Sequence, residues 1–418
     1  MRIVHAADLH VDSPLQGLGR YEGAPVDAIR GATRRALENL VTLCLEEQAA
    51  LLLLAGDLFD GAWKDYATGL FFAAQMARLR ETGTEVVLIR GNHDAASEVA
   101  RHLTTAEHVH ELSTRRPETL ALDDIGVAVH GQGFPSREVS EDLGARYPAA
   151  RAGAINIGLL HTSLTGREGH DPYAPTTPAI LADRGYDYWA LGHVHAREVV
   201  SESPWIVFPG NLQGRHARET GPKGATVITV DAGRIASVEP RVLDAVRWAR
   251  CVVDAAGSTS RDEVIERARD AIASAALEAE GRPCCIRVVI EGATSAHAAL
   301  ASDAERVDAE VRAAALDAGG DAWVERVQLA PRPMFADDLL AVRDDAIGEL
   351  ARGVGAAQHD EALLAELARE LEDLRRKLPS EAKERDGGVD LESPAAMRAL
   401  LTEVEQMLVP RLLGGDEQ

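Results

Sequence analysis

The chain has 418 residues, of which 46% are hydrophobic and 27% are charged, and its formal net charge is -23. This length exceeds one ordinary hydrophobic core, so two or three domains are expected, in a composition typical of globular proteins. The acidity argues against tight, unaided binding to nucleic acid, which requires a basic face.

The first part of the chain alternates apolar runs with stretches of helical spacing. Strands are predicted at residues 3–7, 49–55 and 85–89, and helices at 33–48 and 67–80. The run 49–55 is apolar throughout, as expected of a strand buried on both faces. This order of strands and helices predicts a sheet with helices packed against it.

Fewer helices separate the apolar runs that follow. Strands are predicted at residues 155–160, 186–191, 205–208 and 225–230, and they are expected to form a second sheet packed on the first. The pattern changes near residues 242–250.

A small α+β domain is predicted next, with strands at 251–254, 285–291 and 323–329 and helices at 261–280 and 304–315.

Pro331 and Pro333 then interrupt the pattern, and residues from 336 onward have helical spacing. We expect a flexible loop at 383–390 and a last helix at 394–408. The domain boundaries predicted from these changes are 1–245, 246–332 and 333–418.

The chain contains no apolar run long enough to cross a bilayer. It enters a strand pattern at its first residues with no basic region before it, so we expect no secretory signal and a cytoplasmic protein. Cys44, Cys251, Cys284 and Cys285 have no CxxC spacing, which predicts buried free thiols in a reducing compartment.

Five short polar motifs stand at the ends of apolar runs, where open α/β sheets build their sites. They are Asp8-Leu9-His10, Gly56-Asp57, Gly91-Asn92-His93-Asp94, His161 and Gly192-His193-Val194-His195. Aspartate, asparagine and histidine side chains are ligands suited to divalent first-row metals. One such motif is weak evidence, but five in this order are a specific signal for a metal site.

In this order the motifs resemble those of the calcineurin-like metallophosphoesterases. The segments 5–15 and 208–216 make the chain most similar to the DNA repair exonuclease branch, with its bacterial SbcD- and YhaO-type nucleases. The specific motifs span residues 1–244, and beyond them the likeness is one of architecture. The resemblance implies an α/β fold, a four-layer α/β/β/α sandwich with a small α+β capping domain and C-terminal helices.

Carried over to this chain, the resemblance implies two divalent ions, with manganese favoured and iron or zinc as alternatives. Asp57 would bridge both ions, because one carboxylate has two oxygens to share. The resemblance implies that Asp8, His10 and His195 bind the first ion and that Asn92, His161 and His193 bind the second.

His93 is implied to be a catalytic residue that protonates or stabilises the leaving oxygen, with Asp94 orienting it. Some relatives have a second active-site histidine after the bridging aspartate, but here that stretch reads Leu58-Phe59-Asp60, so no role is assigned to it. Arg215, His216 and Lys223 either contact phosphates or form a solvated loop. His5 is expected to be a hydrogen-bonded core residue.

The predicted function is therefore a two-metal-dependent DNA nuclease, an exonuclease subunit of a repair complex. The resemblance implies DNA and a coiled-coil, SMC-like ATPase as partners. It is compatible with a homodimer, and no membrane partner is expected. One alternative is a phosphodiesterase for a small molecule such as a cyclic nucleotide, which has the same metals and a different pocket. Another is a non-catalytic scaffold for the ATPase, which loss of metal ligands would indicate.

Overall fold

The computed structural model describes residues 1–13, 26–60, 66–96, 106–166, 172–318, 321–333, 344–377, 393–402 and 404. The chain divides into two compact units. The first consists of Met1–Arg250 with Glu278–Ile286, and the second of Cys251–Leu277 with Arg287–Gln418.

The first sheet of the first unit has six strands in the order β12-β11-β1-β2-β3-β4. Strands β1 to β4 run parallel, and β11 and β12 are antiparallel to their neighbours. The bounds are β1 (Arg2–Ala6), β2 (Leu51–Leu54), β3 (Glu85–Leu88), β4 (Val109–Glu111), β11 (Gly224–Asp231) and β12 (Arg234–Val242). The strands predicted at 3–7, 49–55, 85–89 and 225–230 are confirmed, and the parallel ones end at the same edge.

The second sheet has the order β5-β6-β7-β8-β10-β9. Its four central strands run parallel, and β5 and β9 are antiparallel edge strands. The bounds are β5 (Glu118–Leu122), β6 (Val127–Gly131), β7 (Ile155–His161), β8 (Tyr188–Gly192), β9 (Glu198–Glu202) and β10 (Trp205–Phe208). The carboxyl ends of β7 and β8 carry the later motifs.

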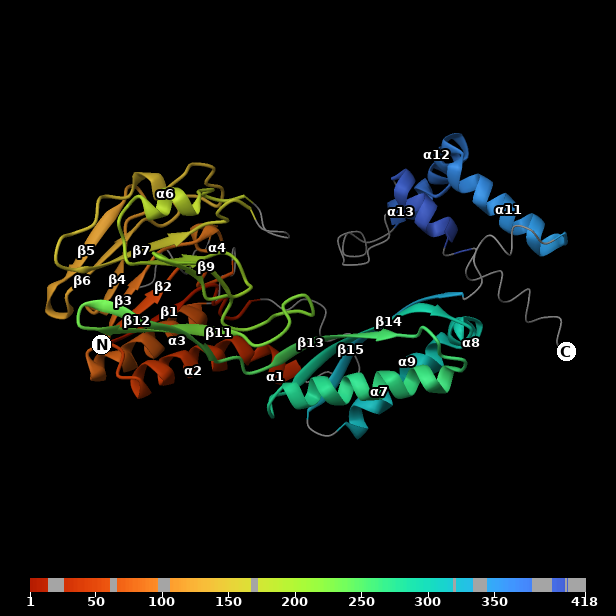
Figure 1. The fold of residues 1–418 in the computed structure, drawn as a ribbon, viewed down its shortest axis with the longest axis horizontal. Coiled ribbons are helices and arrows are strands. Elements are labelled where there is room, and N and C mark those ends of the chain that lie inside the picture. The colour runs from red at the N-terminus through yellow and green to blue at the C-terminus, as the bar shows by residue number, and fades with distance from the viewer. Residues whose placement is uncertain are drawn as a thin grey trace. The chain divides into compact units, whose positions relative to one another are not determined.

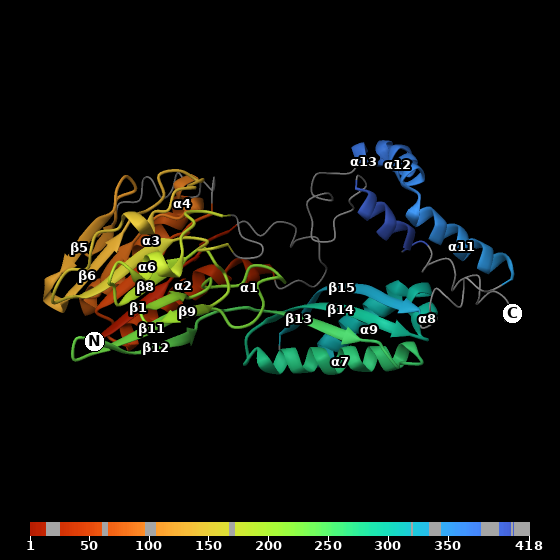
Figure 2. The ribbon, with the colours of Figure 1, turned by 45° about the horizontal axis from the view of Figure 1, so that its top comes forward.

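Helices cover the outer faces of both sheets (Figures 1 and 2). Helices α2 (Ala32–Glu46) and α3 (Tyr66–Leu79) lie on the first sheet, as predicted, and the short α6 (Pro178–Ala182) lies on the second. Two further short helices are α1 (Val26–Arg30) and α4 (Asn92–Ala96).

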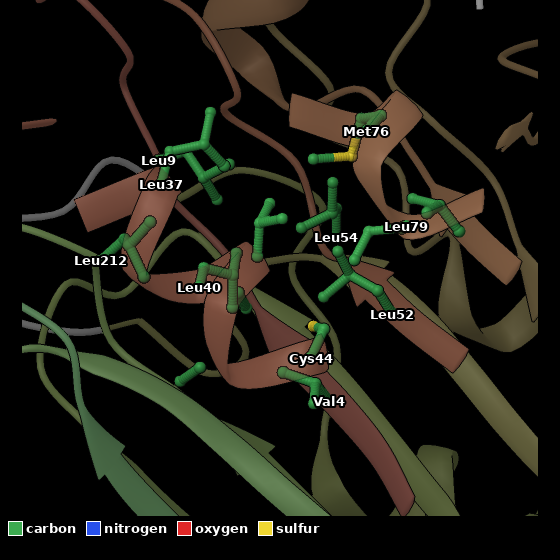
Figure 3. Close-up of a cluster of buried hydrophobic side chains, with 14 of the residues drawn as sticks. Val4, Leu9, Leu37, Leu40, Cys44, Leu52, Leu54, Met76, Leu79 and Leu212 are labelled. Atoms are coloured by element: carbon green, nitrogen blue, oxygen red, sulfur yellow. The ribbon is translucent and has the colours of Figure 1, made fainter. Parts of the chain in front are cut away.

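Three separate hydrophobic clusters fill the three spaces between these layers. Leucines of α2 such as Leu37 and Leu40 pack on Leu52 of the first sheet (Figure 3). A second cluster joins the inner faces of the two sheets, and a third lies between the second sheet and α6. The first unit is therefore the predicted four-layer α/β/β/α sandwich.

A three-stranded sheet of order β13-β14-β15 follows, and most of its residues belong to the second unit. Its strands are β13 (Arg247–Asp254), β14 (Cys284–Thr294) and β15 (Ala322–Pro333), and its helices are α7 (Arg261–Glu278), α8 (His297–Ser302) and α9 (Ala304–Asp317). Ion pairs between Arg261 and Glu310 (3.6 Å) and between Arg269 and Asp317 (2.8 Å) join α7 to α9. The predicted α+β arrangement is present.

The C-terminal region is helical where it is described. Helices α11 (Ala346–His359), α12 (Glu361–Glu370) and α13 (Glu372–Lys377) are followed by a helix over 394–402. Asp360 caps α12 by accepting hydrogen bonds from the amides of residues 362 and 363. Leu364 and Met397 are buried together, so these helices share a small core. The predicted loop 383–390 lies outside the described residues.

Two further expectations can be compared with the structure. Among the described residues, no helix has both the length and the apolar character that a membrane span requires. The four cysteines are buried and free, as predicted.

Candidate metal centre

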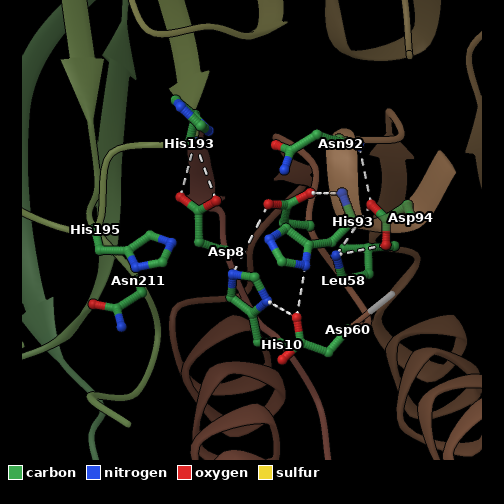
Figure 4. Close-up of polar contacts among 12 residues, drawn as sticks. Asp8, His10, Leu58, Asp60, Asn92, His93, Asp94, His193, His195 and Asn211 are labelled. Atoms are coloured by element: carbon green, nitrogen blue, oxygen red, sulfur yellow. Dashed lines mark hydrogen bonds and ion pairs between the residues drawn. The ribbon is translucent and has the colours of Figure 1, made fainter. Parts of the chain in front are cut away.

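The structure brings all seven predicted ligands to one edge of the sandwich. Each follows or ends a parallel strand: β1, β2 and β3 of the first sheet and β7 and β8 of the second. Figure 4 shows the side chains of Asp8, His10, His93 and His195 converging there. The seven are Asp8, His10, Asp57, Asn92, His161, His193 and His195. His5, by contrast, is a buried core residue hydrogen-bonded to Tyr188, as expected.

The backbone at these positions is unusual. Asp8, His10, Asp57 and His193 have φ values of 52°, 42°, 53° and 99°, in the left-handed region that few non-glycine residues adopt. A Cβ at Gly56 would lie 2.7 Å from His161 Nδ1, so only glycine admits this ligand so close to the chain. The turns after the strands therefore aim the side chains inward.

Asp57 lies at the middle of the cluster. Its Oδ2 is 3.9 Å from His10 Nε2 and 3.5 Å from His161 Nε2. These separations are too long for hydrogen bonds. The 3.5 Å separation suits atoms that share an ion, since ligand bonds of about 2.0–2.2 Å place neighbouring ligands about 3–3.5 Å apart, and the separation from His10 is slightly longer. Asp57 Oδ1 also accepts a hydrogen bond from the His93 amide at 2.9 Å.

The imidazole rings are held so that Nε2 faces the cluster. His161 Nδ1 lies 2.9 Å from the Ala55 carbonyl oxygen, which can only accept, so Nδ1 carries the proton. His161 Nε2 and Asn92 Oδ1, 2.9 Å apart, then both present lone pairs, and a shared cation reconciles them. His10 Nε2 is buried and has no hydrogen-bond partner among the described residues.

The carboxylates also require a positive charge. Both oxygens of Asp8 accept the His193 amide, at 3.1 and 3.0 Å. Burial and the negative charge of Asp57 nevertheless raise the pKa of Asp8 well above its usual range. Donor atoms of Asp8, His10 and His195, and of Asp8, Asp57 and His161, lie within 4.8 Å of one another. This donor set fits two divalent ions.

Asp60 links the predicted ligand His10 to the predicted acid His93. Its Oδ1 is 2.7 Å from His93 Nδ1 and 3.2 Å from His10 Nδ1, and Ser13 donates to its Oδ2. Burial alone would raise the pKa of Asp60, but the bonds from His10 and His93 hold it well below its usual range. For His93, burial is outweighed by Asp60 and Asp57, which raise its pKa. Asp60, to which the sequence assigned no role, therefore holds His93.

Asp94 has a different task from the predicted one. Its carboxylate accepts hydrogen bonds from the amides of Leu58 (2.9 Å), Phe59 (3.0 Å) and Gly91 (3.0 Å). Burial and the charge of Asp57 raise the pKa of Asp94 to about 7. Asp94 thus joins the turn after β2 to the turn after β3, and the side-chain partner of His93 is Asp60.

The segment after β10 also belongs to this region, so the solvated-loop alternative is wrong for Arg215 and Lys223. Arg215 Nη1 is 3.4 Å from Asp60 Oδ2, and its Nη2 is 3.2 Å from Glu219 Oε1. Lys223 Nζ donates to the His195 carbonyl oxygen at 2.8 Å. His216 is more exposed.

Glu219, which no sequence motif singled out, accepts from His195 Nδ1 at 2.6 Å. Burial opposes ionisation of Glu219, but His195 and Arg215 hold its pKa well below the usual range.

Comparison with known proteins agrees with this geometry. Residues 1–197 match the calcineurin-like phosphoesterase family, and residues 248–332 match the middle domain of metallophosphoesterase YhaO. The chain is 36% identical to the uncharacterized metallophosphoesterase YhaO of Bacillus subtilis, over 70% of this chain and 72% of that protein. It is 26% identical to the DNA double-strand break repair protein Mre11 of Methanopyrus kandleri, over 86% and 77% of the two chains. Identity with the D subunit of the nuclease SbcCD from Bacillus subtilis is 24%, over 59% and 72%.

Proposed function

The chain belongs to the calcineurin-like phosphoesterase family, and from this membership we propose that it is a two-metal nuclease that hydrolyses DNA phosphodiester bonds. Relatives named as a double-strand break repair protein and as part of a nuclease, matched over more than two thirds of their lengths, support a DNA substrate and a role in repair. We propose that it acts as the exonuclease subunit of a complex.

The observation that carries the proposal is the position of Asp57 between two sets of ligands. One of its oxygens faces His10 at 3.9 Å and His161 at 3.5 Å, one histidine from each set. We assign Asp8, His10 and His195 to one ion, Asn92, His161 and His193 to the other, and Asp57 to both. The mixed oxygen and imidazole donors suit divalent first-row ions, and we propose manganese, with iron or zinc as alternatives.

When bound, two such ions neutralise the charge of the phosphodiester and make a hydroxide nucleophile available near neutral pH. The separation between the two groups of ligands is fixed because backbone hydrogen bonds hold the turns that carry them. Examples are Asp8 N to Gly56 O (3.0 Å) and His10 N to Asp57 O (3.0 Å). The site is therefore assembled by the fold before substrate arrives.

His93 is positioned to act on the leaving oxygen. Its side chain is 35% exposed, whereas those of His10 and His161 are fully buried, so His93 is accessible to a substrate. Asp60 accepts a hydrogen bond from His93 Nδ1–H and stabilises the imidazolium form, which leaves Nε2 to donate its proton to the departing 3′- or 5′-oxygen. Asp60 and Asp57 raise the pKa of His93, which favours the protonated form that donates to the leaving oxygen.

The test uses purified protein with Mn²⁺ and, in separate reactions, end-labelled DNA, end-labelled RNA and a chromogenic phosphodiester. Manganese-dependent shortening of the DNA supports the proposal. Turnover of the chromogenic ester without any cleavage of DNA would favour a small-molecule phosphodiesterase instead. No turnover of any substrate by protein that has bound two ions would favour a scaffold.

We also propose that the C-terminal helices dock a coiled-coil ATPase, which would supply the grip on DNA that a chain of net charge -23 lacks. A chain that ends after Pro333, where β15 ends, should still cleave the chromogenic ester but should no longer co-purify with the ATPase. Capture of the ATPase by this shortened chain would refute the docking role.

A further inference from the structure

Glu219 is a buried carboxylate that contacts the proposed metal ligand His195 and other residues of its own loop, which follows β10. Its Oε1 accepts from His195 Nδ1 (2.6 Å) and Arg215 Nη2 (3.2 Å). Its Oε2 accepts from the Arg215 amide (2.7 Å) and from Asn211 Nδ2 (3.0 Å). The Nδ1 proton of His195 is thereby fixed, and His195 Nε2 is left to bind a metal.

The same loop continues through Gln213, which is fully buried. Asn211 Nδ2 also donates to the Gln213 carbonyl oxygen at 2.8 Å. The Gln213 side chain donates to Val246 O (2.7 Å), and its Oε1 accepts from the amides of Ala245 (2.7 Å) and Val246 (3.2 Å). Gln213 therefore binds residues 245 and 246 much as a neighbouring strand would.

Residues 245–248 form the segment by which the chain enters β13, and a second contact anchors them to this loop. The indole Nε1 of Trp248 donates to Gly214 O at 2.9 Å, and the Trp248 carbonyl oxygen accepts the Gly221 amide at 3.1 Å. A continuous chain of buried hydrogen bonds thus runs from His195 through Glu219, Asn211 and Gln213 to residues 245–248. Leaving any one of these buried groups unpaired would be costly, so the members of the chain restrain one another.

We propose that Glu219 is a positioning residue for His195, and that Asn211 and Gln213 couple the metal site to the segment 245–248. The inference rests on the metal centre proposed above. A cation held by His195 Nε2 would polarise the ring and strengthen the Nδ1–H bond to Glu219, which would in turn restrain Asn211 and Gln213. Because coupling is reciprocal, order in residues 245–248 should strengthen metal binding to the same degree.

Hydrogen–deuterium exchange of the full-length protein tests this without any variant. Metal content is measured by mass spectrometry in parallel. Saturating Mn²⁺ should slow exchange of the Ala245 and Val246 amides about fivefold or more, the lower end of ordinary coupling. The amides of Ala362 and Leu363, which bond to Asp360 in α12, should exchange at an unchanged rate and serve as the internal control.

A matched pair of variants tests the reverse direction. Trp248→Phe removes one indole donor from a backbone carbonyl on the proposed path and should weaken Mn²⁺ binding about 3- to 10-fold. Trp189→Phe removes the same kind of bond, to Leu181 O at 3.1 Å, away from the path, and should leave Mn²⁺ affinity unchanged. Equal effects of the two variants would overturn the coupling.

The outcomes separate the two proposals. Wild-type protein that takes up no Mn²⁺ refutes the metal centre and this inference together. Protein that binds two ions but exchanges Ala245 and Val246 at the same rate with and without metal refutes the coupling alone. A further variant, Glu219→Gln, keeps the shape and loses the charge, so it should lower Mn²⁺ affinity less than Glu219→Ala does.

Discussion

Replacing Asp60 by asparagine measures what a charged partner contributes to His93. Asp60 Oδ1 lies 2.7 Å from His93 Nδ1, so the variant exchanges a charge-assisted hydrogen bond for a neutral one. A charge-assisted bond contributes about 1.5–3 kcal/mol and a neutral one about 0.5–1.5 kcal/mol, so the exchange costs about 1–1.5 kcal/mol, and the 35% exposure of the His93 side chain argues for the lower end. We therefore expect kcat/KM to fall about 5- to 10-fold.

The assay compares phosphodiesters with good and poor leaving groups, because His93 matters most where the leaving oxygen needs a proton. Asp60→Asn should slow hydrolysis of the phosphodiester with a poor leaving group by the whole expected factor, and that of the phosphodiester with a good leaving group by less. Ser13→Ala is the matched control, since Ser13 donates to the other oxygen of Asp60 without affecting its charge. It should change rates by less than about threefold.

A double variant decides whether Asp60 acts through His93. His93→Asn alone should lower turnover about 10²- to 10⁴-fold, and adding Asp60→Asn should then change little. Metal content must stay constant across the set, because Asp60 also contacts the ligand His10. If Asp60→Asn slows the His93→Asn enzyme as much as it slows the wild type, the reasoning is wrong.

Other parts of the first unit allow three further tests. Asp57→Asn should abolish hydrolysis of every substrate and lower metal content in parallel, because a neutral amide cannot hold two cations together; an active variant would contradict the bridging role. Burial lowers the pKa of His5 to about 3, whereas in the unfolded chain it is about 6.5. Neutral His5 therefore favours the folded state fully above about pH 6.5. As the pH falls, the unfolded chain binds the proton more readily, and the free energy of unfolding drops by about 2 kcal/mol at pH 5. Denaturant unfolding from pH 8 to 5 should therefore show a flatter profile for His5→Gln than for the wild type. Gly192→Ala should lose metal and stability together, because its Cβ would clash with the Ala55 carbonyl oxygen. A normal melting temperature for this variant would argue against the close packing of Gly192 on Ala55.

The five polar motifs could be recognised in the sequence because each one follows or ends a strand of mainly apolar residues. Strands β2, β7 and β8 are buried at every position, so their signal does not depend on which face is exposed. Strands β4, β5, β6, β9 and β12 were not predicted. In the edge strands β5, β9 and β12 most residues are half-buried or exposed, so their apolar signal is weak. Strand β6 is buried at every position, but its apolar run spans only residues 127–129.

The partners of the site residues depend on tertiary contacts that spacing does not encode. Asp94 is adjacent to His93 in sequence, yet Asp60, 33 positions earlier, lies against the His93 ring. Glu219 approaches His195 because the loop after β10 folds back on the sheet edge. Sequence spacing alone therefore predicted the side chains that the structure brings together at the sheet edge and did not predict Asp60 and Glu219, which contact them.

The left-handed backbone at Asp8, His10, Asp57 and His193 has a consequence for stability. Each such residue costs about 1–3 kcal/mol of strain, so four together amount to a large fraction of the net stability of a typical domain. The three hydrophobic cores of the sandwich must supply that energy whether or not ions are bound. Destabilising substitutions in those cores, such as Leu40→Ala, should therefore let the strained turns relax and release metal at temperatures below global unfolding. Heat would then inactivate this protein through the loss of its ions before the sandwich itself comes apart.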